Sequence, residues 1–153
     1  MKYIVFSDSH GRLADMEKAL DKERCDGIIF CGDGYSDAET VENLYPGKAF
    51  IKVTGNCDFR FGVPSETVAR TDGVTFVVCH GHTWGVKDSL YQLRRHAREC
   101  GAGAVLYGHT HLQHLETDED GLLILNPGSI ARGDYAMIEF RNGKVTAELK
   151  EVD

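Results

Sequence analysis

The chain contains neither a long apolar run nor a surplus of basic residues. Its 153 residues include 17 lysines and arginines against 24 aspartates and glutamates, so the formal net charge is −7. Non-specific binding to nucleic acid needs a basic surface that displaces counterions, and this composition disfavours it. Without a membrane-length apolar stretch, we also expect no membrane-spanning helix.

The sequence also lacks a Cys-x-x-Cys motif, and its five cysteines are an odd number. This argues against both a disulfide framework and a structural zinc knuckle. The first residues, Met1–Phe6, carry one positive charge and too short an apolar run for a signal peptide, and no small-residue cleavage site follows. We therefore expect reduced thiols and a cytoplasmic protein.

No linker, internal repeat or low-complexity stretch divides the chain. With 42% hydrophobic residues, 153 residues are enough for one core of useful size. The sequence therefore predicts a single domain over residues 1–153.

In the first two thirds, apolar runs alternate with helical spacings. The expected strands are Tyr3–Phe6, Gly27–Cys31, Ala49–Val53, Glu66–Arg70, Val74–Cys79 and Ala104–Tyr107. Apolar residues three or four apart predict helices over Leu13–Leu20, Asp37–Leu44 and Asp88–Cys100. Apart from one hairpin at Thr71-Asp72-Gly73, this alternation is typical of parallel strands joined by crossover helices.

The last third changes to strands joined by short turns. They are expected at Gln113–Thr117, Leu122–Leu125, Tyr135–Phe140 and Lys144–Leu149. We interpret this part as a β meander. The sequence as a whole then predicts an α/β fold in which two sheets pack face to face with helices outside.

Polar side chains follow the carboxyl ends of five predicted strands. The donors, in chain order, are Asp8, His10, Asp33, Asn56, His80, His109 and His111. Each alone has an ordinary explanation as a turn residue, a helix cap or a core histidine. Open α/β sheets place their sites at these strand ends, however, and seven donors arriving there together favour one shared site.

The donor types predict how many ions such a site holds. Three oxygen donors and four imidazoles are too many for one tetrahedral ion and too rich in nitrogen for calcium or magnesium. Two divalent transition ions that share a bridging carboxylate fit this set. Their net positive charge attracts phosphate locally in spite of the acidic surface.

These motifs together resemble the calcineurin-like metallophosphoesterase superfamily over essentially the whole chain. They are Asp8-x-His10, Gly32-Asp33, Gly55-Asn56, His80 and Gly108-His109-x-His111. The stretches Gly55-Asn56-Cys57-Asp58 and Asn126-Pro127-Gly128-Ser129 are similar to its small bacterial and archaeal phosphodiesterase branch, which is related to Vps29.

The resemblance implies a four-layer αββα sandwich of two mixed β-sheets and a partition of the ligands. One ion would bind Asp8, His10, Asp33 and His111. The other would bind Asp33, Asn56, His80 and His109, so that Asp33 bridges the pair. Mn²⁺ is the ion we expect first, with nickel, cobalt, iron or zinc as alternatives.

The chain departs from many superfamily phosphatases at Cys57. They carry a histidine directly after the metal-binding asparagine, and that histidine is thought to protonate the leaving group. We expect His82, and as a further auxiliary residue Asp58, as candidates for catalytic assistance. Cys57, Asn126 and Ser129 are the candidates for substrate contact.

The leading hypothesis is a phosphodiesterase in which a hydroxide bridging the two metals attacks phosphorus. The substrate would be a small phosphate ester, with nucleic acid involved only as a diester, and the sequence leaves homo-oligomer formation open. A phosphomonoesterase of the same superfamily is one alternative. A Vps29-like protein-binding scaffold is another, which loss of a ligand histidine would indicate, and none is lost. A metallo-β-lactamase-type hydrolase predicts a His-x-His-x-Asp-His run, which is absent.

Overall fold

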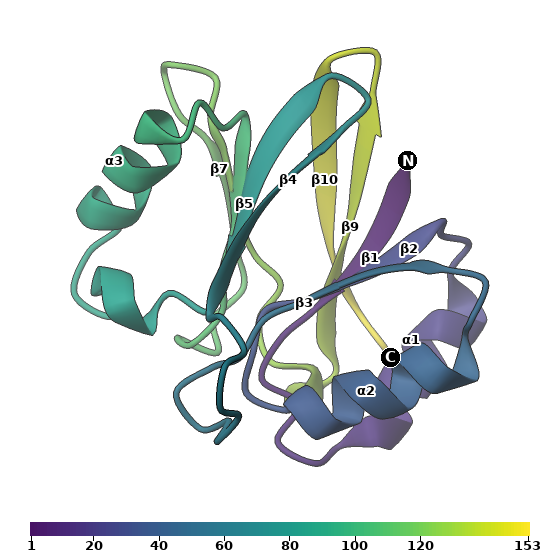
Figure 1. The fold of residues 1–153 in the computed structure, drawn as a ribbon. Coiled ribbons are helices and arrows are strands. Elements are labelled where there is room, and N and C mark those ends of the chain that lie inside the picture. The colour runs from purple at the N-terminus through teal and green to yellow at the C-terminus, as the bar shows by residue number, and fades with distance from the viewer.

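The computed structural model describes residues 1–153, which form ten strands, three α-helices and two short 3-10 helices (Figure 1). In chain order they are β1 Lys2–Phe6, α1 Leu13–Lys22, β2 Gly27–Phe30, α2 Tyr35–Leu44, β3 Ala49–Lys52, β4 Glu66–Thr71, β5 Val74–Cys79, η1 His82–Trp84, α3 Tyr91–Glu99, β6 Ala104–Leu106, β7 His114–Thr117, β8 Leu123–Asn126, η2 Ile130–Arg132, β9 Asp134–Arg141 and β10 Lys144–Glu151. No helix combines the length and the apolar character needed to cross a membrane.

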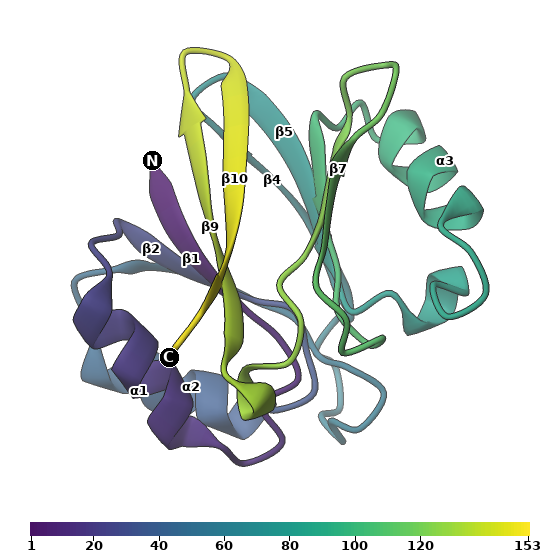
Figure 2. The ribbon, with the colours of Figure 1, turned by 180° about the vertical axis from the view of Figure 1, so that it is seen from behind.

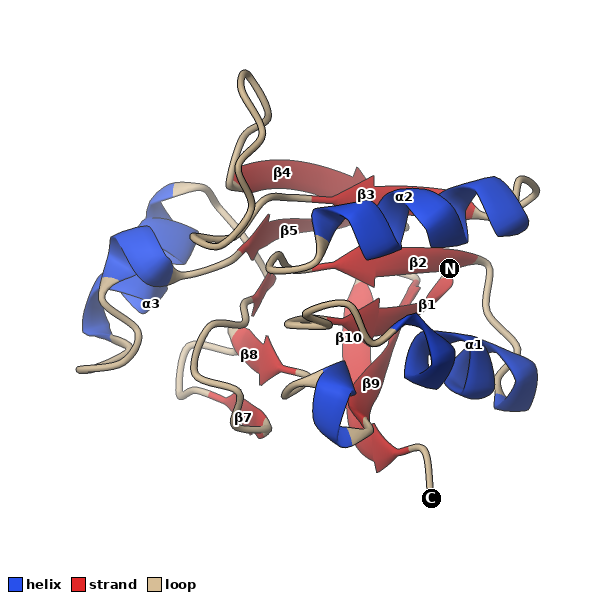
Figure 3. Ribbon diagram, turned by 90° about the horizontal axis from the view of Figure 1, so that it is seen from below, coloured by secondary structure: helices blue, strands red, loops and turns tan.

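The strands form two mixed sheets of five. The first has the order β10-β9-β1-β2-β3, and the second has the order β4-β5-β6-β8-β7. Helices α1 and α2 cover the outer face of the first sheet, and α3 covers the outer face of the second (Figures 1 and 3). This arrangement confirms the predicted αββα sandwich.

Three apolar layers hold the sandwich together. Between the sheets, Phe76 of β5 stacks on Phe140 of β9 with ring centroids 4.5 Å apart. On the first sheet, α1 buries Met16 and Leu20, which lie four residues apart on one helical face. On the second, α3 buries Leu93 in the same way. Each such side chain contributes about 1.5–3 kcal/mol to folding when it leaves water, so the strands form a rigid base for the loops at their ends.

Parallel pairing brings the functional strand ends together. In the first sheet β1 pairs in parallel with β2, and β2 with β3. In the second sheet β5 pairs in parallel with β6. The carboxyl ends of neighbouring parallel strands lie at one edge of a sheet. The loops after these five strands therefore leave the sandwich at a common end.

The predicted β meander of the last third is wrong. β7 and β8 belong to the second sheet, where β8 pairs in parallel with β6, whereas β9 and β10 form a hairpin beside β1 in the first sheet (Figure 2). The chain changes sheets between Asn126 and Asp134, where the Ile130 amide donates a hydrogen bond to the Ser7 carbonyl at the end of β1. All four residues of β8 are buried, as expected for a strand that is covered on both faces. A meander strand with one face in solvent would alternate buried and exposed residues.

Two predicted helices have shifted starts. α2 begins two residues before the expected Asp37, and α3 begins three residues after the expected Asp88. In the second case the amides of Asp88 and Ser89 both donate to the Gly85 carbonyl, and this turn delays the helix.

Candidate metal centre

All seven predicted donors lie in the loops at the common end of the two sheets. Asp8 and His10 follow β1, Asp33 follows β2, Asn56 follows β3, His80 follows β5, and His109 and His111 follow β6. The parallel pairing described above brings them together from distant parts of the sequence, such as His10 and His111, which are 101 residues apart.

One group of ligand atoms comes from Asp8, His10 and His111. Each of the three offers an atom within 4.8 Å of the others. His111 Nε2 lies 3.2 Å from Asp8 Oδ1 and 3.4 Å from His10 Nε2. His10 Nε2 lies 3.8 Å from Asp8 Oδ1, so the Nε2 atoms of both rings face the carboxylate.

A second group comes from Asp33, His80 and His109, again with ligand atoms within 4.8 Å of one another. His80 Nε2 lies 3.2 Å from Asp33 Oδ2, and the rings of His80 and His109 have centroids 5.0 Å apart. The same carboxylate also lies 3.9 Å from His10 Nε2 of the first group. Asp33 is therefore placed between the two groups, and Asp8 Oδ1 of the first group likewise lies 3.9 Å from His80 Nε2 of the second.

The tautomer of His80 and the unpaired atoms of the site fit a metal cation. His80 Nδ1 lies 2.8 Å from the Cys31 carbonyl, which can only accept, so Nδ1 carries the proton and the Nε2 lone pair faces the site. His80 Nε2 and Asp8 Oδ1 are both buried without an aligned hydrogen bond. Buried polar atoms are rarely left unpaired, and a divalent ion would satisfy both.

Neighbouring groups keep the Asp33 carboxylate ionised. Burial alone would raise the pKa of Asp33, but the adjacent His80 imidazole and the Cys57 amide hold it well below its ordinary value. Burial would likewise lower the pKa of His80, which the neighbouring Asp33 and Asp8 raise instead. For His109, burial and the neighbouring His80 and Lys87 side chains lower the pKa. Asp33 is thus an anion throughout the neutral range.

The backbone of the site is conformationally unusual. Five of the seven non-glycine residues with positive φ are donors of this site: Asp8 (55°), His10 (44°), Asp33 (62°), His109 (70°) and His111 (63°). L-residues enter this left-handed region at a cost of about 1–2 kcal/mol each. Such strain collects at functional sites, where the surrounding structure enforces it.

Two glycines permit the close approach of these loops. A Cβ on Gly108 would lie 2.0 Å from Ser7 Oγ, and a Cβ on Gly55 would lie 2.1 Å from Asp33 Oδ1. Gly108 does not have a positive φ, so its backbone conformation does not require glycine. It is glycine because the loop after β6 packs directly on the loop after β1.

Comparison with known proteins supports what this geometry indicates. A model of the calcineurin-like phosphoesterase superfamily domain matches residues 1–143. The chain belongs to this superfamily. The predicted resemblance is thereby confirmed, and the superfamily depends on metal ions.

Individual relatives agree with this placement. The probable metallophosphoesterase YsnB of Bacillus subtilis (strain 168) is 31% identical over 154 residues, covering 95% of this chain and 88% of YsnB. The phosphodiesterase MJ0936 of Methanocaldococcus jannaschii is 28% identical over 152 residues, covering 84% of this chain and 83% of MJ0936. The structure of Vps29 complexed with zinc from Entamoeba histolytica covers 100% of both chains with a TM-score of 0.73 at 19% identity, a likeness that shows the fold alone.

In this member of the superfamily, Asn56 and Cys57 lie exposed at the edge of the site. Cys57 offers its sulfur within 4.8 Å of ligand atoms of His10 and Asp33, and its amide donates to Asp33 Oδ1 at 2.8 Å. Asn56 Nδ2 lies 3.6 Å from Cys57 Sγ. Both side chains are therefore placed where an ion or a substrate can reach them.

Asp58, expected as a catalytic auxiliary, has both carboxylate oxygens occupied by backbone amides. Oδ2 accepts from Asp33 (2.7 Å) and Gly55 (2.8 Å), and Oδ1 accepts from Gly34 (2.9 Å) and Tyr35 (3.0 Å). The carboxylate joins the loops after β2 and β3 and sits at the N-terminus of α2, where negative charge is stabilised. This placement favours a positioning role over a catalytic one.

Of the three other sequence candidates, one lies beside the metal centre and two hold its loops in place. His82 lies beside the site, with its ring centroid 5.4 Å from that of His80. Asn126 is fully buried and donates to the Gly108 carbonyl and to Thr110 Oγ1, and Ser129, 1% exposed, donates to the Asp8 carbonyl. Burial keeps Asn126 and Ser129 from a substrate, and their bonds fix the loops that carry Asp8 and the paired histidines.

The sequence analysis missed two residues that orient the loop after β1. Ser7 Oγ donates to Asp8 Oδ2 at 2.6 Å. Asp37 accepts from Ser9 Oγ at 2.6 Å and from the Gly11 amide at 2.8 Å. Ser7 could have been suspected from its position beside Asp8, but Asp37 lies on α2 and only the tertiary structure connects it to the site.

Replacing Asp58 with alanine tests the positioning role. Asp58→Ala leaves four amides without their acceptor, so we expect the free energy of unfolding to fall by about 2–4 kcal/mol and the metal affinity to fall by about 10- to 100-fold. Denaturant titration and metal titration measure the two effects. The control Asp21→Ala, at an exposed position of α1, should change stability by no more than about 0.5 kcal/mol. An Asp58→Ala protein as stable and as metal-avid as the control would contradict the assignment.

Proposed function

We propose that this protein hydrolyses phosphodiesters with the help of two divalent metal ions. The observation that carries the proposal is the position of Asp33, whose carboxylate stands between two separate groups of carboxylate and imidazole donors. A single-ion site would not need donors on both sides of one carboxylate. The relationship to YsnB and to the phosphodiesterase MJ0936 supports the same reaction class.

The proposed ligands divide as the two geometric groups do. Asp8, His10, Asp33 and His111 would hold the first ion, and Asp33, Asn56, His80 and His109 the second. Four imidazoles among the donors favour a borderline transition ion, of which Mn²⁺ is our first choice, over Mg²⁺ with its preference for oxygen.

Bound ions would supply an activated water near neutral pH and would neutralise charge on the phosphoryl oxygens. The chain's own residues then hold the geometry. His80, fixed through Nδ1 to the Cys31 carbonyl, presents Nε2 in one orientation. Asp33, kept anionic by its neighbours, is held by the Cys57 amide. Cys57 and His82 lie at the rim, where they can contact an ester oxygen. The substrate we propose is a small phosphate diester in the cytoplasm.

A protein-binding function, as for a Vps29-like scaffold, is the second candidate. The whole-chain likeness to Vps29 favours it, as do Phe59 and Phe61, which are 95% and 107% exposed in the loop after Asp58. Against it stands the complete set of seven donors. Turnover of a diester by the metal-loaded protein, lost on chelation, separates the two functions, since a scaffold requires no hydrolysis.

The bridging role of Asp33 predicts an unequal loss of metal between variants. Asp33→Ala should lose both ions and nearly all diesterase activity, while His111→Ala should retain one ion, because His111 serves only the first. Elemental analysis after dialysis counts the ions. His114→Ala, which removes a histidine bonded to Glu116 outside the donor set, should keep both. Two full equivalents retained by folded Asp33→Ala would show that Asp33 does not bridge.

Cys57 predicts which leaving groups the enzyme accepts. A departing alkoxide needs a proton, whereas p-nitrophenolate leaves unaided. A thiol (pKa ~8.5) is a poorer acid at neutral pH than an imidazolium (~6.5), and burial and Asp33 raise the pKa of Cys57 further. The wild type should therefore cleave aryl diesters well and alkyl monoesters poorly.

Cys57→His should raise the alkyl-ester rate by up to about 10²–10⁴-fold, the contribution of a positioned general acid, and change the aryl-diester rate little. Kinetics on both substrates with metal content checked provides the measurement. An unchanged aryl-to-alkyl ratio with both ions bound would contradict the role of this position, and loss of alkyl-ester activity in His82→Gln would then assign the proton to His82.

A further inference from the structure

A pocket of about 490 Å³ is lined in part by the loop that carries His109 and His111. Its walls come from two loops: the segment between η1 and α3, with Lys87 and Leu90, and the segment after β6, with Tyr107, Thr110 and Leu112. We call it the Lys87 pocket. Its volume lies within the range of about 300–1,000 Å³ that is usual for small-molecule sites.

The Lys87 pocket shares a loop with the metal centre. Tyr107, Thr110 and Leu112 line the pocket, and His109 and His111 lie between them in the chain. Asn126 Nδ2 donates to Thr110 Oγ1 at 2.9 Å and to the Gly108 carbonyl at 3.2 Å, so this wall has a fixed position relative to His109. A ligand whose phosphate met the metals would reach the pocket along this loop.

The lining combines apolar surface with one positive charge. Leu112, an apolar side chain, is 64% exposed, and the buried Tyr107 also lines the pocket. Lys87 is exposed and forms no salt bridge within the chain. In a protein of net charge −7, an unpaired lysine beside a phosphate site is suited to an anion.

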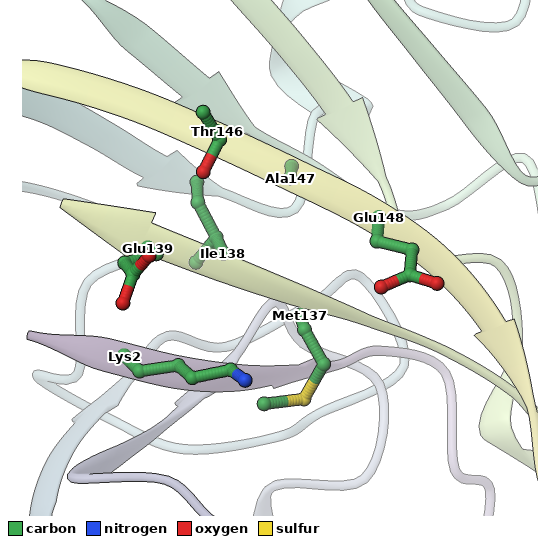
Figure 4. A pocket seen from close by; sticks show the side chains of 7 residues that line it. All are labelled: Lys2, Met137, Ile138, Glu139, Thr146, Ala147 and Glu148. Carbon is green, nitrogen blue, oxygen red and sulfur yellow. The ribbon is translucent and has the colours of Figure 1, made fainter.

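A pocket elsewhere on the molecule shows the contrast. About 220 Å³ in volume, it lies over β1, β9 and β10 (Figure 4). Lys2, which lines it, is at the opposite end of β1 from Asp8, and none of the seven donors reaches it. The Lys87 pocket differs in position, because Thr110 and Leu112 of its wall flank His111 in the chain.

We propose that the Lys87 pocket binds the ester group that a phosphodiester substrate retains after cleavage, and that this group is an apolar or aromatic ring. Lys87 pairs with a phosphate oxygen of the same substrate. The proposal rests on the proposed diesterase function, in which the leaving group departs on the side of Cys57. Cys57 lies next to His10 and Asp33, in the loop after β3, whereas the pocket is lined by the loop that carries His109, so the retained group is directed to the pocket.

Two substrates with one leaving group test this assignment. Phenyl p-nitrophenyl phosphate and methyl p-nitrophenyl phosphate both release p-nitrophenolate and differ only in the retained group. The wild type should have the higher kcat/KM for the phenyl ester. Leu112→Ser should lower kcat/KM for the phenyl ester by about five- to tenfold, since less apolar surface is buried, and should leave the methyl ester nearly unchanged. Leu44→Ser, at a comparably exposed leucine of α2 (55%), should change neither.

Lys87→Gln separates the charge from the apolar contact. It should lower kcat/KM by about two- to fivefold for both esters, the scale of an exposed ion pair, and the loss should shrink at high ionic strength. Lys144→Gln, at an exposed lysine of β10, should have no effect. An equal response of the two esters to Leu112→Ser, or no response of either, would overturn the proposal.

A binding measurement distinguishes failure of the pocket from failure of the diesterase function. By calorimetry, the metal-loaded wild type should bind phenylphosphonate more tightly than methylphosphonate, and Leu112→Ser should remove that preference while both ions stay bound. A protein that hydrolyses neither ester but shows this preference would contradict the diesterase function and support the pocket. Turnover of diesters without any preference for the phenyl group would do the reverse.

Discussion

Two buried carboxylates at the ends of adjacent parallel strands require the rest of the site to compensate their charge. Asp8 is fully buried and Asp33 is 3% exposed. Removing such a charge from water costs several kcal/mol unless donors or cations replace the water. Hydrogen bonds replace part of this lost hydration. The His109 amide and the Ser7 hydroxyl donate to Asp8, and the Cys57 amide donates to Asp33. Asp8 Oδ1 and His80 Nε2 remain without a hydrogen-bond partner, and the other imidazoles of the site lie around these two atoms.

The loops achieve this convergence through strained conformations that the other loops hold in place. The Asp8 amide donates to the Gly32 carbonyl, the His10 amide to the Asp33 carbonyl, and the Gly108 amide to the His80 carbonyl. Each bond joins two site loops, so no loop can relax alone. The apolar layers of the sandwich supply the stability that this arrangement requires. Stability therefore resides mainly in the sheets and function in the loops.

Sequence patterns predicted the strands and the donors at their ends, because apolar runs and the polar residues that follow them are local features. They did not predict that the chain passes from the second sheet to the first after β8, so that β9 pairs with β1. Strand partners depend on packing between distant segments. Nor did sequence patterns predict the positive φ of Asp8 or His111. A histidine in a left-handed conformation carries no mark in the sequence.

The supporting residues were predicted less well than the donors, for the same reason. Asp58, Asn126 and Ser129 were candidates for chemistry because they stand in motifs beside the donors, but their bonds to backbone groups became visible only in the folded chain. The Lys87 pocket was missed because its two walls come from loops separated by α3 and β6. Cys57 could be singled out from the sequence, since its position beside Asn56 is local, and its contact with substrate stays a prediction.

The central claim is that Asp33 joins two metal ions held by different histidines of the pair after β6. Anomalous scattering from crystals soaked in Mn²⁺ tests it most directly. The account predicts two peaks about 3.5–4 Å apart, with Asp33 touching both, His109 on one ion and His111 on the other. A single peak coordinated by both histidines, or two peaks with Asp33 on only one of them, would contradict it.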